Sequence, residues 1–321
     1  MHEIKLIPKV HLHLHLDGSI SKKVVSKLSG LQEEEVEKLM IVPNKCQSLK
    51  EYLGYFDLPI SLMQTKENLI EISKNLIEDL KKDNVIYAEI RFAPMFHTKN
   101  GLTYEEIIEA VLEGLQNNEI KTNLILCLMR GASWYDNMKT IKMAYKYLNK
   151  GVCAIDLAGD EKKYSLDNYQ EFFHLAQKLN IPYTIHAGEV EINEIDKAIK
   201  LNTKRIGHGI TSINNQDILN KIKNNNILLE ICPTSNIQTN IIDNYQNHPI
   251  KKIYNQDVNI SINTDNSSIS NVSLNEEYFK LKQTFNFTKD DFIKININSI
   301  NYSFLTKEEK EKLCKKILLS E

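Results

Sequence analysis

The sequence feature that most constrains this chain is a short run near its amino end in which three histidines alternate with aliphatic residues. The run reads VHLHLHLDG over residues 10–18. In a β-strand, side chains at positions i and i+2 point to the same face, so the imidazoles share one face and the aliphatic side chains share the other. The ring nitrogens need polar partners or a metal ion. One interpretation is a polar strand in a barrel wall, satisfied by its neighbours. Three imidazoles on one face favour metal binding.

Seven further strands are predicted along the chain, each followed by a helical segment. Eight strands that alternate with helices are the signature of a (β/α)8 barrel. No linker rich in proline, glycine or serine divides the chain. We therefore predict an α/β fold, a single barrel domain over residues 1–321 with additional helices. The seven strands are predicted at residues 85–92, 122–129, 151–158, 182–187, 205–209, 227–232 and 258–263.

Three other local patterns lead to predictions that the structure can test. Residues 20–39 place leucine and valine among charges, which predicts one helix. The stretch from Ser48 to Met63 is dense in apolar and aromatic residues, which is typical either of ordinary core or of a lid over a ligand pocket. Glu89 and Arg91 share a face of the second strand, which predicts a structural ion pair between them.

Polar residues gather where the predicted strands end. Barrel enzymes build their sites at the carboxyl ends of the strands, so residues far apart in sequence should meet at one mouth. Any one of these residues alone is compatible with a helix cap, but their joint placement indicates a metal-dependent hydrolytic site. The set comprises His13, His15, Gly159, Asp160, His186, Glu189, His208 and Asp265.

This inventory suits a single zinc ion. Three imidazoles and a carboxylate form a plausible set of ligands that leaves one position for water. A bound metal ion lowers the pKa of water towards neutrality. A nearby histidine and carboxylate can then take the proton of the water, and Glu189 can act as the acid.

The motifs at the strand ends resemble those of the adenosine deaminase family, in the adenosine/AMP deaminase branch of the metal-dependent amidohydrolases. They occur in family order, and the resemblance covers about residues 7 to 315. A lone His-x-His would be weak evidence, but the set together is highly specific. The matching motifs are HLHLDG at 13–18, DLAGDE at 156–161, HAGE at 186–189, GHG at 207–209, CPTSN at 232–236 and NTD at 263–265.

The resemblance implies a set of metal ligands and catalytic groups. One zinc ion per chain would be held by three histidines and an aspartate. Glu189 would deliver a proton to purine N1, which makes C6 electrophilic. His208, with Asp265, would orient and deprotonate the water that attacks C6, and ammonia would leave. The implied metal ligands are His13, His15, His186 and Asp265.

The resemblance also implies substrate contacts. The backbone N–H of Gly159 would bind purine N3, and Asp17 would hold a ribose hydroxyl, with His15 beside the substrate. The segment around Leu53 and Phe56 matches the part that covers the substrate in the family, which favours the lid interpretation.

The sequence departs from the best-known family members at two positions. They carry a second aspartate where this chain has Asn266, and that aspartate contacts purine N7. N7 accepts hydrogen bonds, so an aspartate must be protonated to donate to it, whereas an amide donates without that requirement. Where the family often has glutamate, this chain has His11, which we expect to lie in the barrel interior rather than to bind metal.

The expected reaction is hydrolytic deamination of adenosine and 2′-deoxyadenosine to inosine and 2′-deoxyinosine, in purine salvage. The alternatives are the same chemistry on adenine or on another 6-aminopurine nucleoside, such as aminodeoxyfutalosine or a 5′-modified nucleoside. AMP is disfavoured because no basic cluster lies near the motifs. An alternative from a different class is a catalytically silent ligand-binding protein on the same barrel.

Composition bears on partners and location. The net charge is −2 with dispersed basic residues, so we expect no nucleic-acid partner. We expect no membrane segment and no signal peptide, because no apolar run is long enough. The five scattered cysteines predict reduced thiols in a cytoplasmic protein. The sequence leaves the oligomeric state open, and a monomer is compatible with it.

Overall fold

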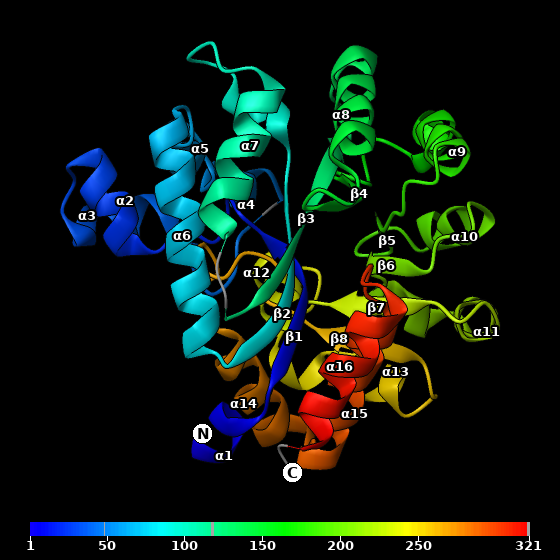
Figure 1. Ribbon diagram of the computed structural model, residues 1–321. Helices are drawn as coiled ribbons and strands as arrows, with labels where there is room; N and C mark the ends of the chain where they lie inside the picture. The colour runs from blue at the N-terminus through cyan, green and yellow to red at the C-terminus, as the bar shows by residue number, and fades with distance from the viewer. Residues whose placement is uncertain (48, 117–118, 320–321) are drawn as a thin grey trace.

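Parallel strands follow one another in sequence order through the centre of the molecule (Figure 1). In the computed structural model, which describes residues 1–47, 49–116 and 119–319, the strands β1 to β4 form one sheet and β5 to β8 form another. Parallel bridges from Ile155 to Tyr183 and from Leu14 to Asp265 join the two sheets. The described residues therefore form an eight-stranded barrel, as predicted. Its strands are β1 (Lys9–His15), β2 (Val85–Phe92), β3 (Lys121–Met129), β4 (Val152–Ala158), β5 (Ile185–Ala187), β6 (Arg205–His208), β7 (Leu228–Ile231) and β8 (Asn259–Ile262).

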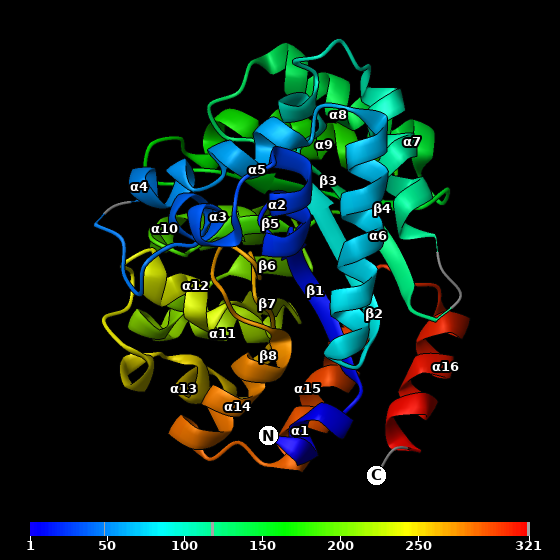
Figure 2. The ribbon, with the colours of Figure 1, turned by 90° about the vertical axis from the view of Figure 1, so that its left-hand side faces the viewer.

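Helices surround the strands, and several of them bury an apolar face in the core (Figure 2). In α6, for example, Leu69, Ile72, Leu76 and Leu80 are buried at helical spacing, and Thr65 caps the helix by accepting from the N–H of Asn68. The helices are α1 (His2–Leu6), α2 (Lys22–Ser29), α3 (Glu33–Met40), α4 (Leu49–Gly54), α5 (Asp57–Leu62), α6 (Lys66–Lys82), α7 (Tyr104–Leu115), α8 (Trp134–Tyr147), α9 (Gln170–Lys178), α10 (Ile192–Lys200), α11 (Gln216–Asn224), α12 (Pro233–Gln238), α13 (Ile250–Tyr254), α14 (Leu274–Phe285), α15 (Lys289–Tyr302) and α16 (Lys307–Leu318), with 3-10 turns at η1 (Pro94–His97), η2 (Leu166–Tyr169), η3 (Ile210–Asn214) and η4 (Tyr245–Asn247).

The predicted single helix over residues 20–39 is wrong, because the chain breaks there into α2 and α3. Gly30 takes a left-handed conformation, with φ of 76°, and ends α2. Gln32 then begins α3 through a capping box with Glu35. A glycine after the last turn and a new cap two residues later stop and restart a helix, although the apolar spacing continues through the break.

The barrel interior holds buried ion pairs that differ from the predicted pair. Arg91 does not pair with Glu89. It lies 2.8 Å from Asp156 and 2.8 Å from Glu230, while Glu89 pairs with Arg205. All five side chains are fully buried. The structural role predicted for Glu89 and Arg91 is therefore right and the partners are wrong, since pairing across the barrel depends on which strands face one another.

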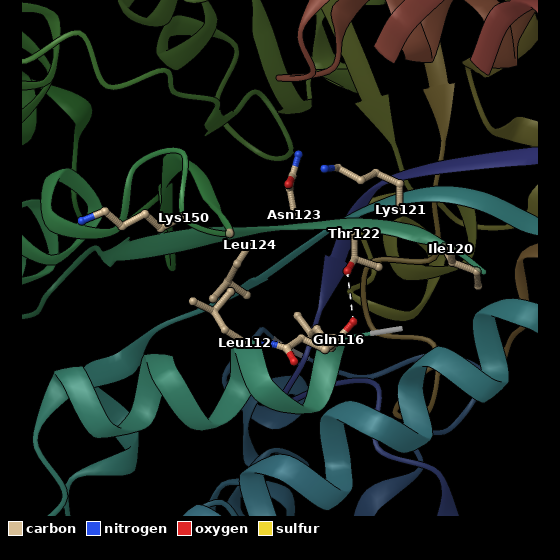
Figure 3. Close-up of a pocket in the computed structure, with 10 residues that line it drawn as sticks. Leu112, Gln116, Ile120, Lys121, Thr122, Asn123, Leu124 and Lys150 are labelled. Carbon is tan, nitrogen blue, oxygen red and sulfur yellow. Dashed lines mark hydrogen bonds between the residues drawn. The ribbon is translucent and has the colours of Figure 1, made fainter. Parts of the chain in front are cut away.

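A cavity of about 400 Å³ lies at the amino-terminal end of β3, away from the predicted site (Figure 3). Thr122 closes part of it by donating from its hydroxyl to the carbonyl oxygen of Leu115, at 3.5 Å. The described residues that line this cavity include no acid, histidine or cysteine. It therefore offers none of the groups that the predicted chemistry needs.

The described residues bear on two of the composition-based predictions. Among them, no helix combines the length and the apolar character needed to cross a bilayer. The five cysteines are free thiols, and all but Cys314 are buried.

Candidate active site

A cavity of about 610 Å³ opens at the carboxyl ends of the barrel strands. Almost every residue that the sequence placed at the strand ends lines it. His13, fully buried, is not among the lining residues and belongs to the metal-ligand cluster instead. The structure thus brings together residues that are up to 251 positions apart. The predicted residues that line the cavity are His15, Asp17, Gly159, Asp160, His186, Glu189, His208, Asp265 and Asn266.

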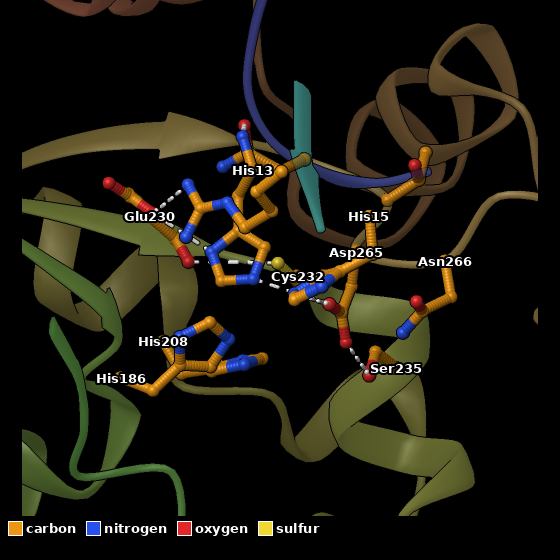
Figure 4. A network of polar contacts seen from close by, with 12 residues as sticks. His13, His15, His186, His208, Glu230, Cys232, Ser235, Asp265 and Asn266 are labelled. Atoms are coloured by element: carbon orange, nitrogen blue, oxygen red, sulfur yellow. Dashed lines mark hydrogen bonds and ion pairs between the residues drawn. The ribbon is translucent and has the colours of Figure 1, made fainter. Parts of the chain in front are cut away.

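Four side chains form a cluster that can hold a metal ion (Figure 4). One ligand atom from each lies within 4.8 Å of the others. Oδ1 of Asp265 is 3.2 Å from Nε2 of His13 and 3.3 Å from Nε2 of His15. The buried Nε2 of His13 has no hydrogen-bond partner, which is the condition expected of an atom that a cation would satisfy. Three nitrogens and one carboxylate oxygen are the donors that zinc prefers. The cluster consists of His13, His15, His186 and Asp265.

Buried acids hold two of these histidines by their other ring nitrogen. Nδ1 of His13 lies 2.8 Å from Glu230, and Nδ1 of His186 lies 2.8 Å from Asp156. Arg91 contacts both acids, and its positive charge helps to hold the pKa of each below its ordinary value. Such outer carboxylates fix the tautomer and the ring orientation, so that Nε2 faces the metal position.

The sequence analysis assigned no role to this outer layer. The available signal was a single acid inside an otherwise apolar strand, as with Asp156 in β4 and Glu230 in β7. A buried charge in such a place must have a partner, but the sequence does not tell which strand supplies it.

Replacing Arg91 with methionine is expected to destabilise the protein and to loosen its metal site. The change leaves Asp156 and Glu230 buried with less compensation, which should lower the free energy of unfolding by about 3–5 kcal/mol. Metal affinity should fall by about 10- to 100-fold. Denaturant unfolding and titration with a competing chelator measure the two effects. Lys27→Met is a control, because Lys27 forms an exposed pair with Glu71 and should change neither quantity appreciably. Wild-type stability and metal affinity in Arg91→Met would contradict this prediction.

Glu189 lies in the loop after β5 and lines the cavity, with its Oε2 3.8 Å from Nε2 of His208. Burial raises its pKa to about 8, with help from the negative charges of Asp265 and Glu161. A raised pKa favours the protonated form of Glu189 at neutral pH, which is the form that a general acid needs.

Glu161 holds the loop that carries Glu189, a role that the sequence analysis missed although Glu161 ends one of the motifs. Its carboxylate accepts from the N–H groups of Gly188 and Glu191, at 2.9 Å each, and from that of Val190. Because these three hydrogen bonds fix the backbone on both sides of residue 189, the acid has little freedom to move.

His208 and Asp265 take left-handed backbone conformations, with φ of 62° and 64°. Such values are unfavourable for residues other than glycine and often occur at functional sites. Burial holds the pKa of His208 well below its ordinary value. Oδ2 of Asp265 accepts from the hydroxyl of Ser235 at 2.7 Å. A Cβ at Gly207 would come within 3.1 Å of the His13 ring, so glycine there lets the histidines approach one another.

The expected substrate contacts, Asp17, Gly159 and Asn266, line the same cavity. Oδ1 of Asp17 is buried without a partner, and burial raises the pKa of Asp17 to about 7. Gly159 has φ of 101°, which only glycine adopts readily, and its backbone lines the cavity. Nδ2 of Asn266 donates to the hydroxyl of Tyr52 at 3.0 Å. Its amide has a second N–H for a ligand.

The apolar segment before α6 covers part of the cavity. Tyr52, Leu53, Phe56 and Ile60 line it, and Leu53 keeps 45% of its surface exposed. This placement fits a lid better than ordinary core. Ser48, at the start of the predicted patch, lies outside the described residues.

His11 lies in the barrel interior, as expected. Its Nε2 accepts from the backbone N–H of Thr264 at 3.1 Å, and it is not part of the metal cluster found among the described residues. His11, the histidine of the opening run that is not in the cluster, thus anchors the backbone at Thr264, next to Asp265.

An eight-stranded parallel barrel with three histidines and an aspartate at its carboxyl mouth defines a class, that of the barrel proteins with a mononuclear metal centre. Comparisons with known proteins agree. The family model described as Adenosine deaminase matches residues 8–319. A protein named adenosine deaminase from Clostridium acetobutylicum is 42% identical over 97% of each chain. A protein of the same name from Clostridium perfringens is 39% identical over 98% of each chain.

The chain belongs to the adenosine deaminase family. Among solved structures, the N6-methyl-AMP deaminase from Arabidopsis thaliana superposes with a TM-score of 0.87 and 26% identity, covering 98% of this chain and 97% of the other.

Proposed function

We propose that this protein catalyses the hydrolytic deamination of adenosine and 2′-deoxyadenosine, giving inosine or 2′-deoxyinosine and ammonia in purine salvage. The observation that carries the proposal is a partly buried acid, Glu189, in the same cavity as a cluster of metal ligands. Family membership and the names of relatives at about 40% identity support adenosine as the substrate. A catalytically silent binding protein would have no need for the acid, the base and the ligands together.

One zinc ion per chain would be held by the four-residue cluster. When bound, zinc supplies a Lewis acid that makes water nucleophilic near neutral pH. The residues of the chain do the rest. Glu189 gives a proton to purine N1, which draws electrons from C6. His208 and Asp265 orient the attacking water and accept its proton. Water adds its oxygen to C6, and the proton taken from it passes to the amino group, so that the C6–N bond breaks and ammonia leaves. The remaining proton of the C6 hydroxyl then returns to Glu189, which leaves the C6 carbonyl of the product.

The charges of the cavity favour a nucleoside over a nucleotide. The lining includes Asp17, which we assign to a ribose hydroxyl, and Asp160. The guanidinium of Arg130 is already engaged by Glu194 and by the carbonyl of His186. Among the described lining residues this leaves Lys163 as the cation for a phosphate. The relative from Arabidopsis, whose name refers to a nucleotide, keeps AMP as an alternative to test.

Substrate kinetics test the proposal directly. Zinc-loaded protein should convert adenosine and 2′-deoxyadenosine with higher kcat/KM than adenine, AMP or aminodeoxyfutalosine, measured by the absorbance change on deamination. A preference for adenine or for aminodeoxyfutalosine would replace the proposed substrate with that alternative.

Replacing Asn266 with aspartate is expected to make activity pH-dependent in a new way. If residue 266 donates to purine N7, the carboxyl must be protonated to do so, whereas the amide donates at every pH. The ratio of kcat/KM between Asn266→Asp and wild type should therefore be highest at low pH and fall as the pH rises through the pKa of the new acid. A ratio that stays constant from about pH 5 to pH 9 would show that residue 266 does not donate to purine N7.

We further propose a single domain over residues 1–321, since the strands from both halves of the chain close one ring. Free thiols favour a reducing compartment, and we place the protein in the cytoplasm. A monomer is sufficient for the site, because every proposed residue comes from one chain.

A further inference from the structure

One buried amide, that of Asn236 in helix α12, contacts both proposed proton-transfer groups. Its Nδ2 lies 3.1 Å from Nδ1 of His208 and 3.4 Å from Oε1 of Glu189. On its other side, its Oδ1 lies 3.3 Å from Nε2 of His248. Asn236 and His248 are both buried, and neither belongs to the metal cluster nor lines the cavity. The proposed function gives them no role.

The direction of these hydrogen bonds follows from a single backbone group. The N–H of Ile250 can only donate, and it lies 3.2 Å from Nδ1 of His248. That nitrogen therefore carries no proton. Burial lowers the pKa of His248 to about 3, so the ring is neutral and its proton is on Nε2. Nε2 donates to Asn236, and the acceptor atom of the amide must be its oxygen.

The orientation of the Asn236 amide in turn fixes which ring nitrogen of His208 carries the proton. With Oδ1 towards His248, the NH2 group of Asn236 faces His208 and can only donate. Nδ1 of His208 must then be the acceptor, and the proton of the neutral ring is on Nε2. Nε2 lies 3.8 Å from Oε2 of Glu189, on the cavity side.

The second N–H of Asn236 acts on Glu189. It reaches Oε1, which also receives a contact of 3.3 Å from the hydroxyl of Thr239. An oxygen that accepts hydrogen bonds on this side is disfavoured as the site of the acid proton, which places that proton on Oε2.

We propose that Asn236 is a positioning residue that sets the proton positions on both His208 and Glu189, and that His248 sets the orientation of Asn236. This inference deepens the proposed function and rests on it. Within the pair that handles the attacking water, His208 then only orients the water through its N–H, and Asp265 rather than His208 accepts the proton. Glu189 presents Oε2–H to purine N1.

Nuclear magnetic resonance of zinc-loaded protein with 15N-labelled histidine tests the proton positions without reference to turnover. Two-bond 1H–15N correlations distinguish the two neutral tautomers, and the signal of His208 is assigned by its loss in His208→Asn. We expect the Nε2–H tautomer in the wild type. In Asn236→Asp the carboxylate can only accept, so the signal should change to the Nδ1–H tautomer. An Nδ1–H tautomer in the wild type overturns the inference.

Kinetics provide the second measurement. Asn236→Asp should lower kcat for adenosine by about tenfold or more while KM changes little, because the substrate does not contact residue 236. Asn255→Asp adds the same charge at an exposed position after α13 and should leave kcat unchanged. An unchanged kcat in Asn236→Asp would contradict the proposal.

Two variants of His248 allow the inference to be tested even if Asn236→Asp does not fold. Glutamine keeps an N–H for Oδ1 of Asn236, whereas leucine removes it. His248→Gln should keep the Nε2–H tautomer of His208 and most of kcat, and His248→Leu should lose both. Equal effects of the two changes would show that His248 acts only through packing. Wild-type protein that fails to deaminate adenosine would refute the proposed function, but its tautomers would still decide this inference.

Discussion

Glu189→Gln is expected to lower turnover of adenosine by at least about a hundredfold while the zinc content stays unchanged. The amide has nearly the shape of the acid, but it cannot give a proton to purine N1. Zinc should remain, because Glu189 is not one of the four cluster residues. The measurements are kcat from the absorbance change and metal content by elemental analysis of the same preparation.

The control for this change is Glu191→Gln in the same loop. Glu191 does not line the cavity, and only its backbone N–H takes part in holding the loop. The Glu191→Gln variant should therefore retain the wild-type kcat. An unchanged rate in Glu189→Gln would remove the assignment of Glu189 as the proton donor.

The pH profile offers an independent check of the same residue. Glu189 works in its protonated form, which is present below its pKa of about 8 and lost as the pH rises through it. A bound cation lowers the pKa of a nearby acid. The alkaline limb of kcat/KM should therefore lie at or below about pH 8.

Removal of the metal is expected to abolish activity completely. Dialysis against a chelator should bring turnover to background, and one equivalent of zinc per chain should restore it. Magnesium should not restore it, because it prefers oxygen ligands and the cluster offers three imidazoles. Full activity in protein shown to be free of metal would refute the proposed mechanism.

A ligand variant separates loss of metal from the effects of the chelator. His186→Ala should lose both zinc and turnover, since it removes one of four ligands and the contact with Asp156. His174→Ala is the matched control, as His174 is exposed on α9. Zinc retained at one equivalent in His186→Ala would show that the cluster is not the metal site.

Much of the fold was predictable because periodicity is a local property. The alternation in β1 and the apolar runs of the other strands depend only on neighbouring residues, and the β2 prediction matches the observed bounds of Val85–Phe92. The break between α2 and α3 was missed, since the apolar spacing continues across Gly30 while the backbone does not. The helix-ending glycine and the new N-cap thus outweigh the helical spacing of the apolar residues at this position.

The candidate metal ligands were also predictable, because histidine and aspartate at strand ends are visible in the sequence and barrel topology brings strand ends together. The choice of His13, His15, His186 and Asp265 among them followed from the resemblance to the family. The residues that support them were not predictable. Arg91 pairs across the barrel with acids from β4 and β7 rather than with Glu89 on its own strand. Which buried charge faces which depends on the register and the closure of the ring.

The sequence by itself thus determined the alternation of strands and helices and the barrel, and its motifs predicted the ligand set and the acid through the resemblance to a family. Only the tertiary structure decided how these groups are held and protonated. Three sets of contacts join segments that are distant in sequence. They are the hydrogen bonds of Glu161 to the loop after β5, the ion pairs of Arg91 with two acids, and the chain of hydrogen bonds from Ile250 to His208. The direction of a hydrogen bond depends on which donor meets which acceptor in space, and no local pattern carries that information.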